Sequence, residues 1–173
     1  ALNYPSVAFV DIEVWVPEEG IKSFDDWCQE VPTEILTISV VTQNNTAIVM
    51  GTTDLSPIEQ TEIQMKINED FSKIGYECKF KYIKYANELE MLQGFFGKIV
   101  PMFGLLTGWN FIKFDWTYLT NRFKKLGGDP AIASPTRTMN YKETMPSHVA
   151  IIDYAAIFSK HDRSIKVKEN NTL

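Results

Sequence analysis

Two carboxylates near the start of the chain, Asp11 and Glu13, interrupt an otherwise apolar run. Alternate residues of a β-strand share a face at a separation of about 6–7 Å, so both carboxylates are expected on one surface. Their repulsion, on the order of 2.5 kcal/mol at an effective dielectric of about 20, and their desolvation need an offsetting interaction. Mg²⁺ or Mn²⁺ would supply it, because hard cations prefer oxygen ligands. For this motif alone, a solvated strand face or pairing with Lys or Arg is the alternative.

A second candidate segment runs from Thr107 to Asp115. A strand here would deliver Asn110 at its carboxyl end, which is where α/β sheets bind ligands. Asp115 would then fall in the first turn of the next helix, where the helix dipole tolerates a carboxylate. The alternative is that Asp115 only caps its helix.

The elements that must position these residues can be predicted from periodicity and turn signals. The run 8–16 predicts a central strand, which Pro17 ends. Asn44-Asn45 predicts a tight hairpin between two further strands, because this dipeptide tolerates positive φ angles. The remaining expected elements are strands over 35–42, 46–52, 78–85, 103–109 and 148–153, and helices over 56–71, 87–99 and 116–126, with a short helix through Phe158.

Three of these elements carry further expectations. The helix from Ser56 looks acidic and solvated, and the strand 78–85 looks like an edge strand. Gly127-Gly128 suits a left-handed helix end, and 129–147 is expected to be irregular. Strands followed by strand–helix alternation predict an α/β fold with helices covering a mixed sheet.

Composition limits the class of protein. A chain of 173 residues with 45% hydrophobic residues is expected to form a single domain over 1–173. Its apolar stretches are too short for a membrane span or a secretory leader, so a soluble cytoplasmic protein is expected. Cys28 and Cys78 are expected to be packing thiols. A net charge of −5 argues against a self-sufficient duplex binder, although 10 of 17 Lys and Arg residues follow residue 109.

Together the two segments resemble the exonuclease motifs of family B DNA polymerases, in a form close to that of T-even-like phage enzymes. Phe9-Val10-Asp11-Ile12-Glu13-Val14 looks like the first motif, and Leu106 to Asn110 with Phe114-Asp115 looks like the second. Further agreement lies at Glu34-Ile35, Asn87-Glu88-Leu89, Asn121-Arg122 and Ile152-Asp153-Tyr154. The resemblance therefore spans most of the chain.

The resemblance implies a ribonuclease H-like fold of the DEDD exonuclease superfamily. It implies removal of the 3′-terminal nucleotide of a mispaired primer with two divalent metal ions, Mg²⁺ or Mn²⁺. Asp11 would bridge both ions, Glu13 would bind the ion on the nucleophile side, and Asp115 would support the second. Asn110 would contact the single-stranded 3′ end, with Trp109 and Phe111 beside it. For Trp15 and Trp109, core packing is the alternative to base stacking.

The sequence departs from the family pattern at the third motif, because no Tyr-x-x-x-Asp pentad occurs up to Leu173. Phe158 to Asp162 has the spacing but follows the Asp153 strand too soon. His148 and Asp153 have the His-x₄-Asp spacing of another branch of the superfamily and are an alternative completion of the site. The domain is therefore expected to end before the third motif, either as an excised piece or as part of a polymerase encoded in pieces.

Two functions of different class follow. One is a metal-dependent exonuclease domain that works with the remaining polymerase domains or a separate polymerase polypeptide, in the host cytoplasm if the gene is a phage gene. The other is a non-catalytic module that binds single-stranded 3′ ends or docks onto the polymerase. Arg122, Lys124 and Lys125 could steer DNA, with a solvated helix face as the alternative.

Overall fold

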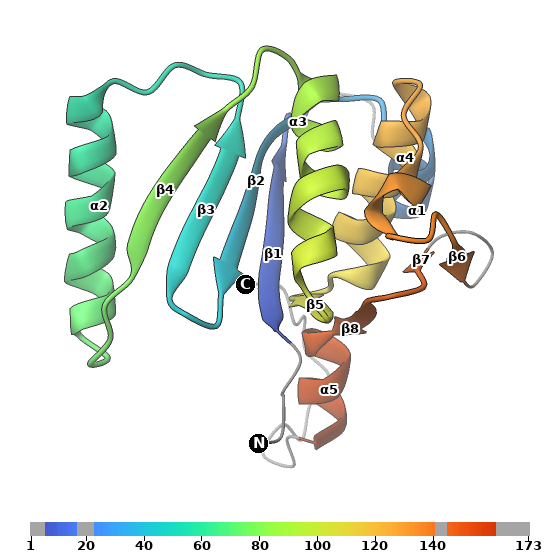
Figure 1. The fold of residues 1–173 in the computed structure, drawn as a ribbon. Helices are drawn as coiled ribbons and strands as arrows, with labels where there is room; N and C mark the ends of the chain where they lie inside the picture. Colours follow the sequence, from blue (N-terminus) through green and yellow to red (C-terminus); the bar gives the residue numbers. More distant parts are fainter. Residues whose placement is uncertain (1–5, 17–22, 141–144, 162–173) are drawn as a thin grey trace.

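A six-stranded mixed sheet carries the fold of the computed structural model, which describes residues 6–16, 23–140 and 145–161 (Figure 1). The strand order is β4-β3-β2-β1-β5-β8. β1 pairs antiparallel with β2 and parallel with β5, so it lies inside the sheet as predicted. The strands are β1 (Val7–Val14), β2 (Ile35–Thr42), β3 (Thr46–Gly51), β4 (Lys79–Lys84), β5 (Leu105–Gly108) and β8 (Ala150–Asp153).

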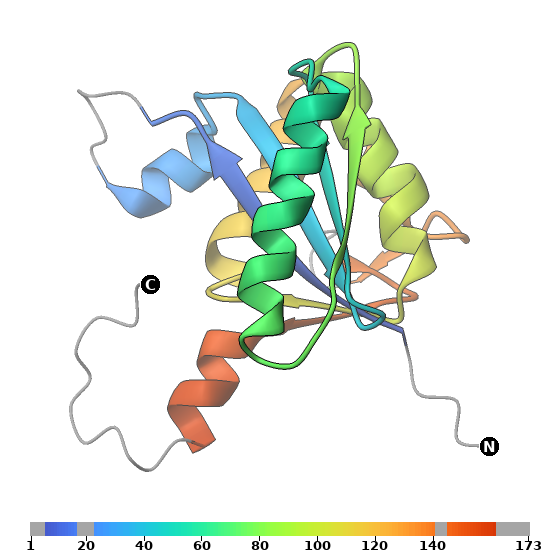
Figure 2. The same cartoon turned by 90° about the vertical axis from the view of Figure 1, so that its left-hand side faces the viewer.

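Five α-helices accompany the sheet in the described residues, and π-helical turns adjoin two of them. None of these helices is long and apolar enough to cross a membrane. Figure 2 shows α1 beside the C-terminal end of β1. The helices are α1 (Phe24–Glu30), α2 (Pro57–Ser72), α3 (Glu88–Gly94), α4 (Thr117–Lys125) and α5 (Tyr154–His161), and the π-helical turns are Phe95–Ile99 and Ile112–Trp116.

The alternation of β1 separates a buried face from an open one. Ala8, Val10 and Ile12 are buried, and they belong to the core formed with side chains of α1, α3 and α4. Phe9, Asp11 and Glu13 occupy the other face and are exposed. The fold is the mixed α/β, ribonuclease H-like arrangement expected from the sequence.

Several local predictions are confirmed. Ser56 and Glu59 form a capping box at the start of α2, which has no buried residue and is therefore solvated as expected. β4 is an edge strand. Asn45 adopts a positive φ of 54° in the hairpin, and Gly127 does so at 86° after α4. Cys28 and Cys78 are free, buried thiols.

Other predictions need correction. The sequence analysis missed α1, although Ser23 caps it by accepting a hydrogen bond from Asp26 N. β1 ends at Val14 instead of Val16, and β5 covers only Leu105–Gly108 of the predicted 103–109. The segment 129–147 is not wholly irregular, because it contains a 3₁₀ turn and a two-residue ladder between β6 (Met139–Asn140) and β7 (Met145–Pro146).

Arg122 does not lie on a solvated helix face, because it forms a partly buried ion pair. Its Nε and Nη2 donate to the two carboxylate oxygens of Glu88 at 2.9 and 2.8 Å, and the two side chains are only 13% and 12% exposed. Arg122 Nη1 also donates to Val31 O, while Glu88 Oε1 accepts from Ile35 N. Lys125 Nζ donates to Glu30 O and Val31 O, so Arg122 and Lys125 both bind the backbone at the end of α1. The ion pair ties α4 to the start of α3 and to the turn before β2.

We expect Arg122→Lys to lower the free energy of unfolding by roughly 1.5–3 kcal/mol, because a lysine keeps the positive charge but loses one hydrogen bond of the bidentate pair with Glu88. Urea denaturation measures this change. Lys73→Gln, which removes exposed ion pairs to Glu69 and Asp70, is the control and should change stability by less than about 1 kcal/mol. Equal effects of the two substitutions would contradict the structural role of Arg122.

Candidate active site

Asp115 is joined to the first carboxylate motif by a hydrogen bond to the central strand. Its Oδ1 accepts from Ile12 N at 3.0 Å, and Ile12 lies between Asp11 and Glu13. Asp115 is 2% exposed, whereas its two sequence partners on β1 lie on the open face. The hydrogen bond therefore brings together segments that are more than 100 residues apart in the chain.

A π-helical turn presents Asp115 to β1. The turn Ile112–Trp116 is widened, with Trp116 N donating to Phe111 O at 2.8 Å and Thr117 Oγ1 donating to Ile112 O. Such turns are frequent at functional sites because the added residue changes the direction of the side chains that follow. Trp116 is also buried. The turn therefore places the Trp116 side chain in the core and the Asp115 side chain against β1.

The environment of Asp115 favours its protonated form. Burial, the nearby Asp11 carboxylate and, to a smaller degree, Asp153 raise the pKa of Asp115 to about 7, while the hydrogen bond from Ile12 N opposes the shift. Burial also raises the pKa of Asp11. Two acidic groups with raised pKa values at one edge of a sheet are typical of a site that binds a cation or transfers protons.

Asp153 and His148, the alternative pair, are not brought together. Asp153 ends β8 and its Oδ1 accepts from Ala155 N and Ala156 N, so it caps α5 while its charge acts on Asp115. His148 precedes β8, and its Nε2 lies 3.4 Å from Val100 O. The two residues thus occupy opposite ends of one strand, with only Asp153 near the carboxylates.

The residues after β5 have different environments. Asn110 is partly exposed and adopts a positive φ of 55°, which turns the chain from the strand into the π-helical turn. Phe111 is fully buried and its ring packs beside Trp116, so its side chain belongs to the core instead of facing a DNA strand. Trp109 is partly exposed and packs against Tyr154 and Phe158 of α5.

Gly108 allows the close approach of β5 to β1 beside Asp11. A Cβ at this position would lie 2.4 Å from the Val10 carbonyl oxygen and 3.2 Å from the Phe111 ring. The first of these contacts involves the backbone, which cannot move without disturbing the strand pairing. The sequence analysis named Gly108 within the second motif but did not predict this role, and its only sequence signal is its place at the end of the strand.

The carboxylates fit a divalent ion bound partly by substrate. Within residues 6–16, 23–140 and 145–161, no three His, Cys, Asp or Glu side chains are grouped closely enough to hold a metal ion by themselves. Mg²⁺, however, is usually bound by one or two carboxylates together with water and substrate phosphates. Asp11 and Asp115 are two carboxylates whose charges interact, and Glu13 follows Asp11 on the same face of β1.

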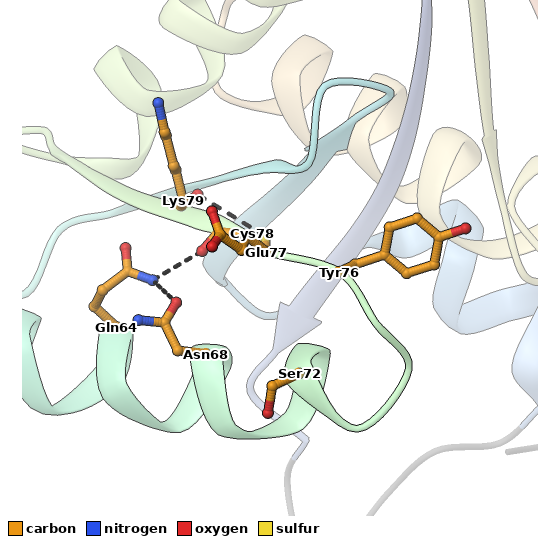
Figure 3. A pocket seen from close by; sticks show the side chains of 7 residues that line it. All are labelled: Gln64, Asn68, Ser72, Tyr76, Glu77, Cys78 and Lys79. Atoms are coloured by element: carbon orange, nitrogen blue, oxygen red, sulfur yellow. Dashed lines mark hydrogen bonds between the residues drawn. The ribbon is translucent and has the colours of Figure 1, made fainter.

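A separate pocket of about 420 Å³ lies between α2 and the segment leading into β4 (Figure 3). Gln64 spans it by donating to Asn68 Oδ1 and Cys78 O and by accepting from Phe80 N. These hydrogen bonds attach α2 to the sheet edge. Three strands separate β1 from the far side of β4, so this pocket is not part of the carboxylate site.

The raised pKa of Asp115 predicts a pH-dependent stability. In the folded state the pKa of Asp115 is about 7, whereas its ordinary value is 3.8. Between pH 3.8 and pH 7 the folded protein therefore binds more protons at Asp115 than the unfolded protein does. With a chelator present, the free energy of unfolding should therefore fall between about pH 4 and pH 7, by on the order of 4 kcal/mol. Urea denaturation across this range should show a shallower fall for Asp115→Asn, and parallel curves for parent and variant would contradict the assignment. Asp70→Asn, at an exposed site on α2, is the matched control.

We expect Gly108→Ala to destabilise the protein by roughly 1–3 kcal/mol, because the added methyl group forces β1 and β5 apart. The comparison is with Gly97→Ala, whose Cβ would meet only Ile132 Cδ1 at 3.5 Å in a helical segment. That control should be neutral or stabilising by up to about 1 kcal/mol. Thermal and urea unfolding of both variants would test the difference, and an unaffected Gly108→Ala variant would contradict it.

The comparisons with known proteins agree with this geometry. A search of curated proteins returned no match. The family model described as DNA polymerase family B, exonuclease domain, matches residues 8–169, which include both carboxylate motifs and Asp153. Because this match covers most of the sequence, the chain belongs to the exonuclease domain family of family B DNA polymerases.

Proposed function

We propose that this chain removes the 3′-terminal nucleotide from a primer strand by metal-dependent hydrolysis, and that it thereby proofreads DNA synthesis. The observation that carries the proposal is the hydrogen bond from Ile12 N to Asp115, which places a buried carboxylate within electrostatic reach of Asp11. Membership of the exonuclease domain family supports a DNA substrate and 3′→5′ polarity. The form of both motifs also supports the T-even-like phage type.

Asp11, Glu13 and Asp115 are the proposed ligands of two divalent ions, Mg²⁺ or Mn²⁺. Bound ions of this kind activate water and neutralise charge on the phosphate and the leaving oxygen. The chain would contribute a deprotonated Asp115, because a nearby cation favours the charged form and opposes the raised pKa. The Ile12 N–H would hold Oδ1 of this carboxylate and leave Oδ2 for the ion.

Asn110 is the proposed contact to the primer end. It is partly exposed and lies between β5 and the π-helical turn that carries Asp115, where it adopts a positive φ. Its amide can donate to and accept from a nucleotide. Trp109 remains a proposed DNA contact, through the part of its ring that α5 leaves exposed.

The test compares degradation of a 3′-mispaired, 5′-labelled primer by the parent, Asp11→Ala and Asp115→Asn in Mg²⁺ or Mn²⁺. We expect both variants to lose activity by about 10²–10³-fold, because each removes a carboxylate that would hold a divalent ion, and the ion would stabilise the negative charge of the transition state. Glu62→Gln, which alters an exposed carboxylate of α2, should retain full activity. Undiminished cleavage by Asp11→Ala would refute the proposal.

Metal binding is measured separately, because the sequence has no Tyr-x-x-x-Asp pentad and cleavage could require a further carboxylate. Calorimetric titration with Mn²⁺ should show binding to the parent and to Glu62→Gln, and none to Asp11→Ala. Binding without cleavage by the parent would support the ligands but replace the catalytic proposal with a module that holds 3′ ends. Absence of binding and of cleavage would reject both parts.

A further inference from the structure

We propose that Phe9 and Tyr154 form a stacking platform for an unpaired base next to the phosphodiester bound at Asp11. The inference rests on the proposed function, and it adds the part of the site that recognises the base. Neither residue belongs to the carboxylate set. Both are aromatic side chains on the open side of the sheet, and together they are called the Phe9–Tyr154 platform below.

The platform lies directly beside the first carboxylate. Phe9 and Asp11 are consecutive residues on the open face of β1, about 6–7 Å apart by strand geometry. Phe9 is 47% exposed and Tyr154 is 45% exposed, so two large apolar residues in contact with each other both face solvent. Their ring centroids are 6.3 Å apart in an edge-to-face arrangement at 74°. Each ring therefore leaves a large part of its surface open.

α5 holds Tyr154 in this position from two sides. Asp153 caps the helix through hydrogen bonds from Ala155 N and Ala156 N, which fixes the start of α5 at the end of β8. Trp109 packs against Tyr154 with a centroid distance of 6.3 Å and against Phe158 at 5.6 Å. These contacts already restrict the Tyr154 side chain, so binding a base would cost little additional side-chain entropy.

A nucleobase is the occupant that fits this position. The site beside the platform is acidic and takes the phosphodiester only with cations, and a nucleotide carries its base about as far from its phosphate as Phe9 lies from Asp11. Val41, which pairs with Phe9 across β1 and β2, adds an apolar neighbour on the same face. Proteins that bind single strands without sequence preference use aromatic rings in this way, because every base has a flat face.

The experiment measures binding of a 5′-labelled single-stranded oligothymidylate by fluorescence anisotropy, with Ca²⁺ in place of Mg²⁺ to avoid turnover. The same strand with abasic sugars at its last two 3′ positions is the reference. We expect the parent to bind the base-bearing strand about tenfold more tightly than the abasic strand. Phe9→Leu and Tyr154→Leu keep apolar volume without the ring and should bind the two strands almost equally.

Two control variants separate stacking from general apolar character. Phe9→Trp retains a flat ring and should keep the preference for the base-bearing strand. Tyr76→Leu removes an aromatic ring from a residue that is 58% exposed and lines the pocket between α2 and the segment leading into β4 (Figure 3), and it should also keep the preference. Circular dichroism would check that each variant is folded. We expect folding to be retained, because Phe9 and Tyr154 are exposed and their substitution leaves the core unchanged.

Equal binding of both strands by the parent would overturn the platform, as would an unchanged preference in Phe9→Leu and Tyr154→Leu. Either result would instead indicate that a polypeptide segment covers these rings. The proposed function fails differently. If the chain prefers the base-bearing strand but does not cleave DNA in Mg²⁺, the platform is supported and the exonuclease proposal is rejected. If the chain cleaves DNA but binds the two strands equally, the exonuclease proposal is supported and the platform is rejected.

Discussion

The hydrogen bond between Ile12 N and Asp115 is the interaction on which the candidate site depends. A strand interior has few free N–H groups, and this one lies between Asp11 and Glu13 on an edge that β5 leaves unpaired, since the β1–β5 pairing ends at Phe9 and Thr107. The N–H satisfies a carboxylate that would otherwise be buried without a partner. It also fixes Asp115 close enough to Asp11 that their charges interact. The burial of the Asp115 carboxylate and its repulsion by Asp11 both disfavour its charged form, and a bound cation would offset both effects.

A second network sets the position of the helix that carries Asp115. α4 continues from the π-helical turn, and one side of α4 makes polar contacts with α1, with the segment between α1 and β2, and with the first residue of α3. Its contacts are Tyr118 Oη to Thr33 O, Asn121 Nδ2 to Cys28 O, Arg122 to Glu88 and Val31 O, and Lys125 Nζ to Glu30 O. Agreement with the family outside the two motifs included Asn87-Glu88-Leu89 and Asn121-Arg122, and the structure gives a physical reason, because Glu88 and Arg122 are partners.

Most regular elements were predictable from the sequence, but helix α1 and the irregular turns were not. The alternation around Asp11 gave β1 and its open face, and Ser56 with Glu59 gave the start of α2. Among the candidate site residues, Asp11 and Asp115 are electrostatically coupled in the structure. The π-helical turn was not predictable, because it depends on tertiary packing of Phe111 and Trp116 and has no local pattern. Asp153 lies near Asp115 because β5 and β8 are adjacent parallel strands, which spacing along the chain does not reveal.

The wide separation of Ile12 and Asp115 in the chain has a consequence for the order of folding. β1, β2 and β3 are neighbours in sequence and pair by closing short loops. β5 also pairs with β1, but about 90 residues of chain separate these two strands. Contacts of long sequence separation are slow to form. We therefore expect β1, β2 and β3 to pair before Asp11 and Asp115 meet, so that a nascent or partly folded chain carries no assembled candidate site. Premature degradation of DNA by incomplete molecules would be avoided by topology alone.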